Sequence, residues 1–514
     1  MKIRRTSSAA LKILGLGLLD AWLAGCAVGP NYHAPHTPTP EKFVATAPSA
    51  TPAPGSAAVD LAQWWRALKD PELDALIDRA IKANPDIEIA LTRLQEARTR
   101  QAALVSDALP EAGAGGAAGR GTGSDLARGR APPALASADN TAGVSQIREV
   151  VGFDANWDLD LFGKYRREVE AARYDTQAAS WARKAVLIAV VANVARAYVD
   201  MRGLQMRLAI ARQDITSAQQ FRDIVQTRFE RGITNELDLT LANRELATLQ
   251  SDVAPLQAQV SATQYTLAVL LGEYPEALTA QLAKPGLIPA IPEQIEPGLP
   301  LDLLRRRPDI QEAERQLAQA TARIGVATAN LFPRLGISAG VGTQSASIGT
   351  EQGSHIWSVG PAVYWPLLDF GSLDAAVDVA DLQAHERLVS YKRTVVDAVR
   401  DADTAISNFA AEQDRLKNLD TAMIASERAV SLASQRYDRG LSDFLNVVDA
   451  ERQEYNLEAE YTATQQGAAD AFVNLYQALG GGWEQYQSVP PIRRPQPAIL
   501  AALRRLATSE DSDK

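Results

Sequence analysis

The chain has 514 residues, 46% of them hydrophobic, and a formal net charge of −10. A chain of this length can bury several cores, so composition alone favours two or more domains. The acidic balance argues against nucleic acid as a partner, and one cysteine with four scattered histidines offers no disulfide pair and no metal-ligand spacing, so we expect neither a metal site nor an enzyme.

The N-terminus is typical of an export signal. Basic residues precede an apolar run over residues 13–19, and Leu23-Ala24-Gly25-Cys26 follows. This tetrad resembles the lipobox of bacterial lipoproteins. The resemblance implies that residues 1–25 are removed as a signal peptide, that Cys26 becomes the lipidated first residue of the mature protein, and that Ala27 suits delivery to the outer membrane.

A first structural unit is expected over residues 63–272. It follows an acylated N-terminal segment at 26–62 that is rich in Pro, Thr and Ala and is expected to be a tether or an extended surface strap. The unit opens with Trp64-Trp65 and a short amphipathic helix, and a second helix runs from about Pro85 to Ala108. Residues 111–162 then predict a β-hairpin, with a strand rich in glycine and alanine, a polar loop and a second strand near Trp157.

The longest uninterrupted segment, 163–230, predicts a single helix of roughly 100 Å at about 1.5 Å per residue. Its apolar and small residues alternate in spacings of three and four, which is the pattern of helices that supercoil against long neighbours. They are Leu187, Val190, Val194, Ala197, Met201, Leu204, Leu208, Ala211, Ile215 and Ala218. A turn and a returning helix at 235–271 complete the unit.

The same order of elements recurs over residues 301–482, so the chain is internally duplicated. Pro308-Asp309-Ile310 repeats Pro85-Asp86-Ile87 at an offset of 223, whereas the offset from Val151 onward is 208. The repeat predicts a second hairpin at about 333–369, a long helix at 371–438 and a returning helix at 443–479. The change of offset predicts a longer loop in the first hairpin.

The two units are joined by a proline-rich linker at 273–300, and the chain ends in an irregular extension at 483–514. Four strands cannot close a membrane barrel, and open strand edges are not tolerated in hydrocarbon. Several chains must therefore share one barrel. We expect an α+β membrane protein that forms a cyclic homo-oligomer, in which a barrel continues into a long helical cylinder that serves as a conduit.

The ordered set of motifs resembles the TolC-like outer-membrane efflux proteins, and most closely their lipid-modified OprM/NodT branch. The motifs are the lipobox, Trp64-Trp65, Asp160-Leu161-Phe162-Gly163, Leu304-Arg305-Arg306-Arg307-Pro308-Asp309-Ile310, Phe332-Pro333 and the two Arg-Gly turns. The resemblance implies a homotrimer with a twelve-strand outer-membrane barrel and a twelve-helix periplasmic tunnel. It also implies a role as exit duct for small toxic compounds, fed by an inner-membrane RND-type transporter through a periplasmic adaptor protein.

The resemblance also implies residues that gate the tunnel. Asn446 and Asp449 match the two positions of the periplasmic constriction, where three copies of Asp449 would form an anionic ring. Asp238 and Tyr437 match a latch in which the carboxylate accepts a hydrogen bond from the phenol. The alternatives are an ordinary solvated carboxylate near a helix N-terminus for Asp449 and two unpaired surface side chains for the latch.

The turns after the two long helices resemble the tips on which the adaptor docks, although glycine there also serves ordinary helix capping. The residues are Arg231, Gly232, Ile233, Thr234, Arg439, Gly440, Leu441 and Ser442. We expect no cofactor beyond the covalent lipid on Cys26. Two other functions stay open on the sequence: a type I protein-secretion conduit, and a coiled-coil surface lipoprotein without a pore.

Overall fold

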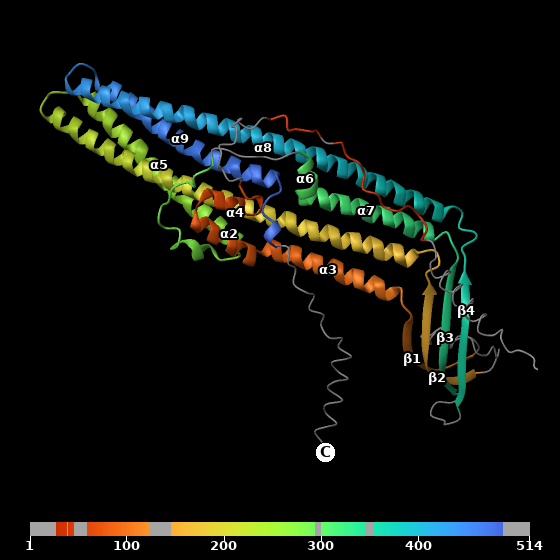
Figure 1. Cartoon of the computed structure of the whole chain (residues 1–514). Coiled ribbons are helices and arrows are strands. Elements are labelled where there is room, and N and C mark those ends of the chain that lie inside the picture. The colour runs from red at the N-terminus through yellow and green to blue at the C-terminus, as the bar shows by residue number, and fades with distance from the viewer. Residues whose placement is uncertain are drawn as a thin grey trace, which may run out of the picture.

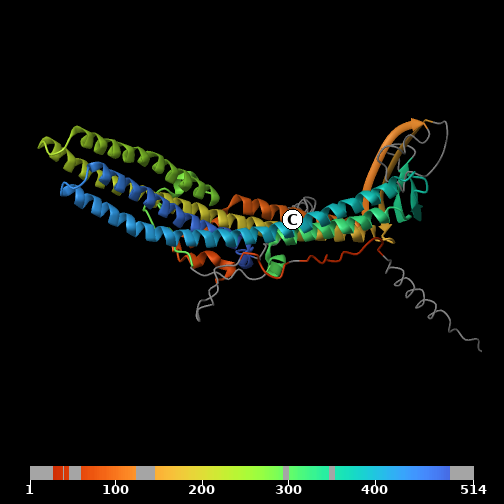
Figure 2. The ribbon, with the colours of Figure 1, turned by 90° about the horizontal axis from the view of Figure 1, so that it is seen from above.

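The protein is described from a computed structural model that covers residues 27–38, 40–45, 59–122, 145–292, 300–345 and 353–486. Cys26, the predicted signal peptide and the last part of the C-terminal extension lie outside the described residues. The described part is an elongated body in which helices run along most of the length and a sheet lies at one end (Figure 1). Figure 2 shows from above that the same helices lie side by side in a narrow bundle.

Each half of the chain supplies two strands between helices. The first half contains η1 (Leu61–Leu68), α2 (Pro71–Ala83), α3 (Pro85–Asp107), β1 (Glu111–Thr122), β2 (Ser145–Leu159), α4 (Lys164–Glu230) and α5 (Glu236–Leu270). The second half contains α6 (Pro300–Arg306), α7 (Pro308–Ala329), β3 (Arg334–Ser345), β4 (Gly353–Tyr364), α8 (Ser372–Asp438) and α9 (Phe444–Ala478).

The internal duplication is visible in the lengths of the elements. Helices α4 and α8 both have 67 residues, α5 and α9 both have 35, and their bounds differ by the offset of 208 found in the sequence. Strands β1 and β3 both have 12 residues and differ by the offset of 223. The change of offset falls between β1 and β2. The loop between β1 and β2 consists of residues 123–144, whereas the corresponding loop between β3 and β4 consists of residues 346–352.

Both long helices begin at a glycine in the left-handed region, Gly163 with φ of 81° and Gly371 with φ of 85°. An aspartate just upstream then satisfies free N–H groups of the first helical turn. Asp160 accepts backbone hydrogen bonds at 3.2 and 2.9 Å at the start of α4, and Asp369 accepts one at 2.7 Å at the start of α8. Because four N–H groups of a helix start lack helical partners, these carboxylates fix where the long helices begin.

Two shorter helices lie end to end along each long helix (Figure 1). Helix α4 contacts α3 and α5, and α8 contacts α7 and α9; α4 also contacts α7 and α9, which joins the halves. The largest apolar core lies where these helices meet at the middle of the body, which we call the waist. There the Trp64 ring stacks on the Tyr476 ring at 5.7 Å, and both are almost fully buried.

The linker and the start of the C-terminal extension are more ordered than the irregular segments expected from their proline content. Part of the linker forms η3 (Pro275–Leu278), and the Leu278 and Leu282 side chains are completely buried in the waist core. In the extension, Trp483 packs edge-on against Trp181 at 5.5 Å. The reason is apolar burial: large side chains placed at intervals in a loop anchor it without any secondary-structure pattern.

The four strands form one antiparallel sheet in the order β1-β2-β3-β4, so β2 and β3 join the two halves. The register places Phe153, Val341 and Trp357 side by side on one face. The next residues along the strands, Asp154, Gly340 and Ser358, lie side by side on the other face. The sheet therefore has an apolar face and a face of small and polar residues.

Helix α4 contains a window long and apolar enough to cross a membrane by length and composition, but half of that window is buried within the protein. Most apolar residues of α4 between Leu187 and Met201 belong to the waist core. Burial against protein explains this apolar stretch.

Candidate functional site

The end of the helical body away from the sheet, which we call the tip, consists of two closely similar turns (Figure 1). In the first, the N–H of Gly232 donates to the Phe229 carbonyl and the N–H of Ile233 to the Arg228 carbonyl, both at 2.9 Å. The same pair of bonds recurs at Gly440 and Leu441 at the same distances. Both glycines have φ near 70°, so each turn is a helix C-terminus closed by a left-handed residue.

The turns expose apolar side chains. Ile233 and Leu441 are 62% and 64% exposed, and Leu237 and Leu445, one helical turn further on, are exposed as well. The arginines Arg231 and Arg439 beside the glycines are also exposed, whereas Thr234 and Ser442 are half-buried. Each of the two predicted docking turns thus exposes one arginine and one aliphatic side chain at the tip, Arg231 with Ile233 and Arg439 with Leu441.

The predicted hydrogen bond between Asp238 and Tyr437 is absent. Asp238 instead accepts from the Thr234 hydroxyl on the same turn. The Tyr437 side chain is buried, and its hydroxyl has no hydrogen-bond partner among the described residues. Its ring packs against Phe444 at 5.3 Å and under the Arg228 guanidinium at 4.5 Å. Local competition from Thr234 and aromatic packing of the ring explain why the sequence-based pairing is wrong for this conformation.

Tyr437 belongs instead to a small apolar cluster that holds the tip together. Val225 on α4, Ala242 on α5 and Phe444 on α9 meet it there. The cluster therefore joins the α4–α5 coil to the α8–α9 coil by burial of apolar surface.

The two predicted gate residues lie exposed on the first turns of α9, one helical turn apart. Asp449 accepts a hydrogen bond at 2.9 Å from Arg452, which lies one further turn along the helix. The Asn446 amide makes only a long contact of 3.5 Å to the Asp443 carbonyl. An anionic ring at this level would therefore be accompanied by a ring of guanidinium groups, which the sequence-based interpretation did not consider.

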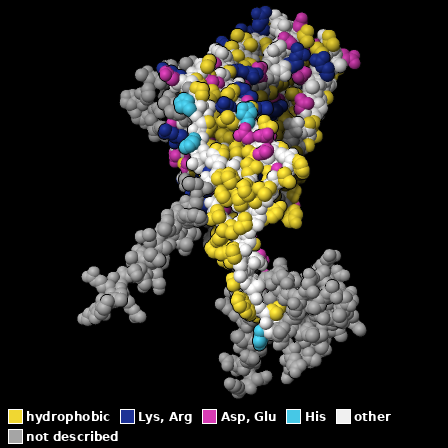
Figure 3. Space-filling view, turned by 90° about the vertical axis from the view of Figure 1, so that its right-hand side faces the viewer, with side chains coloured by type: hydrophobic (Ala, Val, Ile, Leu, Met, Phe, Trp, Pro, Cys, Tyr) yellow, Lys and Arg dark blue, Asp and Glu magenta, His cyan; other side chains and the backbone are white. Residues whose placement is uncertain are grey.

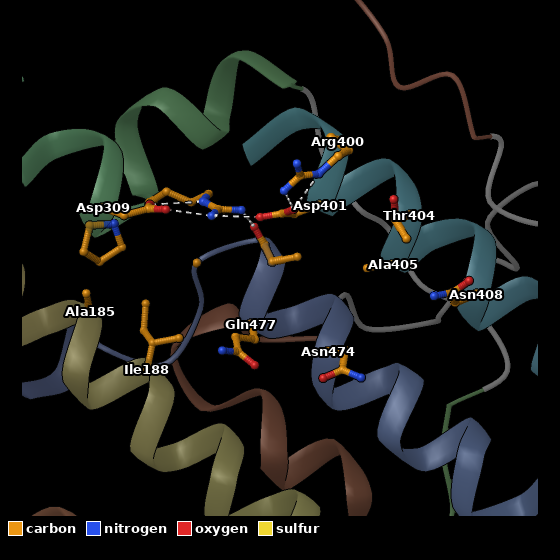
Figure 4. A pocket seen from close by; sticks show the side chains of 14 residues that line it. Ala185, Ile188, Asp309, Arg400, Asp401, Thr404, Ala405, Asn408, Asn474 and Gln477 are labelled. Atoms are coloured by element: carbon orange, nitrogen blue, oxygen red, sulfur yellow. Dashed lines mark hydrogen bonds and ion pairs between the residues drawn. The ribbon is translucent and has the colours of Figure 1, made fainter. Parts of the chain in front are cut away.

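The waist contains a cavity of about 440 Å³ between α4, α7, α8 and α9 (Figure 4). Arg307 lies at its edge, and its guanidinium donates to Asp309 at 2.7 Å, to Asp401 at 3.5 Å and to the Ala478 carbonyl at 3.1 Å. These bonds tie the start of α7 to α8 and to the end of α9. The residue belongs to the family motif, but its clamping role could not be inferred from sequence spacing because Asp401 and Ala478 are distant in the chain.

An extended N-terminal segment, which we call the strap (residues 27–38 and 40–45), runs along the outside of the helices (Figure 1). Arg167 on α4 is 3% exposed and donates to the Val28 and Gly29 carbonyls, both at 3.1 Å, and to Asn31 at 2.9 Å. Further along, the backbone N–H of Val44 donates to Asp403 on α8 at 2.8 Å. A strap bonded to both halves of the chain is a structural element and not a free tether.

The strap brings its first described residue to the junction between sheet and helices. The N–H of Val28 donates to the Phe162 carbonyl at 3.1 Å, and Ala27 packs so closely on Gly163 that a Cβ there would lie 2.7 Å from the Ala27 Cα. Cys26 itself lies outside the described residues, but it is covalently joined to Ala27 at this junction.

The apolar face of the sheet is exposed and gathers hydrophobic side chains at the strand end of the molecule (Figure 3). Phe153, Val341 and Trp357 on this face are 66%, 57% and 76% exposed. On the opposite face, a Cβ at Gly113 or at Gly336 would come within 3.1 Å of the Asp154 or the Asp158 carboxylate on β2. The absence of a side chain at each glycine leaves room for the carboxylate on β2 beside it.

The outer strands have unused edges. In the described part of the chain, β1 pairs only with β2 and β4 pairs only with β3. The described residues also include no group of three or more His, Cys, Asp or Glu side chains placed to hold a metal ion. The described sheet therefore has a free edge on each side, on β1 and on β4, at which a further strand could pair.

A sequence model of the family described as outer membrane efflux protein matches residues 76–273 and 299–481, which are the two halves of the duplicated body. The chain belongs to this family. The solved structure of the outer-membrane channel OprN is 33% identical, covers 89% of this chain and all of that one, and superposes with a TM-score of 0.79.

Other members of the outer membrane efflux protein family match over nearly their whole length. Nodulation protein T of Rhizobium leguminosarum bv. viciae is 29% identical over 95% of this chain and 96% of its own. The antibiotic efflux pump outer membrane protein ArpC of Pseudomonas putida is 29% identical over 92% of this chain and 96% of its own. The predicted family is thereby confirmed, and with it the assignment to the outer membrane, where such proteins form channels with a helical tunnel in the periplasm.

Proposed function

We propose that three copies of this chain close into one tube that serves as the outer-membrane exit duct of a tripartite efflux pump. The observation that carries the proposal is the pair of unused edges on β1 and β4. An open edge leaves backbone N–H and C=O groups unsatisfied in hydrocarbon, whereas β1 of one copy can pair with β4 of the next. Three copies then supply a closed barrel of twelve strands.

The helices support the same ring. The four helices next to the sheet lie in the order α3-α4-α7-α8, as do the strands β1-β2-β3-β4. Helices α3 and α8 are therefore the outer ones, as β1 and β4 are in the sheet. Along α8, Leu382, Val389 and Val396 are 67%, 53% and 68% exposed at a spacing of seven residues. A heptad stripe of exposed apolar side chains on an edge helix needs another helix against it, and α3 of a neighbouring copy would provide one.

The apolar face of the sheet would contact lipid and the small polar face would line the bore, while the helices would form a tunnel of twelve helices in the periplasm. The strap would place the acylated Cys26 at the membrane surface, beside the junction of sheet and helices. The name of the relative ArpC supports small toxic compounds as the cargo. The duct would receive them from the periplasm or from an inner-membrane RND-type transporter.

The tip would meet the periplasmic adaptor protein. Two matching turns with an exposed arginine and an exposed aliphatic side chain, at Ile233 and at Leu441, offer each chain two equivalent contacts. Exposed apolar side chains on rigid, glycine-closed turns are suited to hot-spot contacts.

The closed tip would be held by packing and guarded by polar rings. The buried contact between Tyr437 and Phe444 would take the place of the hydrogen-bonded latch with Asp238. Asn446 and Asp449 would line the constriction, with Arg452 reducing the negative potential of the Asp449 ring.

The test is a conductance measurement on the purified, full-length protein in planar bilayers, joined to a deletion strain. We expect single-channel currents, and greater susceptibility of the deletion strain to toxic small molecules with normal secretion of proteins. Absence of current from correctly assembled protein would remove the pore and favour a scaffold. Loss of a secreted protein without a change in susceptibility would favour the type I secretion conduit.

A further inference from the structure

Acidic side chains are buried where the two coils of the chain meet. On the tip half of the molecule, α9 packs against α4 and, more lightly, against α5. Asp214 on α4, Glu245 on α5 and Glu451 on α9 are 8%, 9% and 5% exposed in this contact. Glu454 and Glu458 on α9 are half-buried beside them. We call these five residues the carboxyl seam.

The buried members of the seam have no partner. Among the described residues, the structure contains no hydrogen bond and no ion pair to the side chain of Asp214, Glu245 or Glu451. Unlike Oδ1 of Asp470, their carboxyl oxygens are not completely enclosed, so partial burial among other carboxyl groups, and not complete loss of water, disfavours the charged form of Asp214 and Glu451. A carboxyl group that carries a proton avoids this cost.

The charged groups that surround the seam do not neutralise it. Arg452 on α9 is engaged with Asp449, and Arg415 on α8 is engaged with Glu460. Arg207 lines a cavity of about 390 Å³ together with Asp214, Asp252 and Tyr455, but it forms no ion pair with Asp214. Glu427 on α8 adds a further negative charge towards Glu454 and Glu458. The cavity gives water access to the Asp214 end of the seam.

Burial, together with the neighbouring Glu458 and Glu454, raises the pKa of the Asp214 carboxyl to about 7. Burial likewise raises the pKa of Glu451 to about 7, with Glu454 and Glu245 adding to the effect. The pKa values of Glu454 and Glu458 are raised by the same causes. Asp214 and Glu451 therefore change charge near neutral pH while the two coils are packed.

The other half of the chain has no such seam. Under the repeat offset of 208, Asp214 and Glu451 correspond to Ala422 and Asn243. The remaining seam residues, Glu245, Glu454 and Glu458, correspond to Gln453, Leu246 and Gln250. In the proposed trimer, these neutral residues would lie on the contact between neighbouring chains. The acidic groups are thus confined to the contact within each chain.

We propose that the carboxyl seam is a proton-operated closure of the tube: bound protons hold α4 and α9 together within each chain, and their release lets the two coils separate. The inference rests on the proposed function as a duct, since it specifies how the wall of that duct responds to pH. The contacts between neighbouring chains, which are neutral at these positions, would stay closed throughout.

The direction of the effect follows from the proton balance. When the coils separate, the carboxyl groups return to water and to an ordinary pKa of about 4. The packed state therefore binds more protons than the separated one, so acid favours packing and alkali opposes it. Between pH about 4 and about 7, the ratio of packed to separated coils falls about tenfold per pH unit for each of Asp214 and Glu451, and above pH about 7 the stabilisation by their bound protons is fully lost.

The experiment measures single-channel conductance of the full-length trimer between pH 5 and pH 8. The wild type is expected to conduct several-fold more at pH 8 than at pH 5. A variant with Asp214→Asn, Glu451→Gln, Glu454→Gln and Glu458→Gln imitates the protonated seam, and it should keep the low conductance at every pH. These near-isosteric changes remove charge without removing volume, and an unchanged circular dichroism spectrum would verify that the variant folds.

The matched control is Asp470→Asn, because burial also raises the pKa of Asp470 to about 7 but this residue lies on α9 near the waist. The control should retain the wild-type pH profile. The proposal is overturned if the wild type shows no pH dependence, if the seam variant keeps it, or if the control abolishes it. Absence of conductance at every pH would instead contradict the proposed duct, so the two failures are distinguishable.

Discussion

Trp157 and Trp365 donate the same hydrogen bond in the two halves of the chain. The Trp157 indole N–H donates to the Ala108 carbonyl at 3.2 Å, and the Trp365 N–H donates to the Leu331 carbonyl at 3.1 Å. Trp157 lies on β2 and Trp365 directly follows β4, so each bond joins the end of a hairpin to the end of the helix that precedes it. The duplication thus extends to side-chain hydrogen bonds at the boundary between sheet and helices, where an indole with one apolar and one polar end is favoured.

Replacing either tryptophan by phenylalanine should therefore have the same effect. Trp157→Phe and Trp365→Phe each leave a carbonyl without its donor and should cost about 1 kcal/mol of stability. The midpoint of thermal unfolding of the detergent-solubilised protein measures this. Trp357→Phe is the control, because this side chain is 76% exposed on the apolar face and should leave the midpoint unchanged. Equal shifts for all three variants would show that the hydrogen bonds are irrelevant.

Arg167→Ala should release the strap. The variant removes the buried cation that holds three strap residues and leaves Glu170 without its ion-pair partner at 2.7 Å. A hydrogen bond to a charged group is worth about 1.5–3 kcal/mol, so the loss of the bonds to Val28, Gly29 and Asn31 should free this end of the strap. Limited trypsin cleavage after Lys42, followed by mass spectrometry, should be much faster than in the wild type. Arg173→Ala, an exposed change on the same helix, is the control, and an equal cleavage rate in both variants would contradict the clamp.

If Tyr437 acts through packing and not through a hydrogen bond to Asp238, variants of these two residues should change the single-channel conductance differently. Because the hydroxyl has no partner, the double variant Asp238→Ala with Tyr437→Phe should leave single-channel conductance unchanged. Tyr437→Ala, which removes the ring from the tip cluster and costs about 3–5 kcal/mol of packing, should increase it. An increase in the double variant would restore the latch hypothesis.

The tip turns should be needed for the pump and not for the pore. Ile233→Asp with Leu441→Asp places charges on the two exposed turns and should abolish resistance to toxic compounds in cells. The same variant in planar bilayers should conduct like the wild type, since the turns themselves keep their glycine geometry. Wild-type resistance in cells would exclude these side chains from adaptor docking.

Much of the fold is predictable from local and periodic features. The long helices are predicted by the absence of proline from Gly163 to Glu230 and by the alternating spacings of three and four from Leu187 to Ala218. The two repeat offsets predict the hairpins that precede them. The position of the tip turns follows from glycines at which the chain must adopt a positive φ.

The candidate site is less predictable because its contacts join distant parts of the chain. Arg167 reaches the strap 136 residues away at Asn31, and Arg307 reaches the Ala478 carbonyl 171 residues away. No spacing rule connects such pairs. One member of the carboxyl seam could be noticed in the sequence. Glu451 follows Phe444 and Val448 at spacings of four and three residues, so a carboxyl group stands where the heptad pattern predicts an apolar residue. Its burial, however, depends on α4, which the periodicity of α9 cannot reveal.

The central claim, that β1 of one copy pairs with β4 of another in a closed threefold ring, is tested most directly by disulfide cross-linking between the two edges. Single cysteines at Ala112 or Ala114 on β1 are combined with cysteines at Trp357, Val359 or Pro361 on β4, and the oxidised protein is analysed on a denaturing gel. The account predicts that at least one pair gives dimers and trimers with the trimer as the largest product, and that each single cysteine gives no trimer. Only monomers for every pair, or a ladder continuing beyond the trimer, would contradict it.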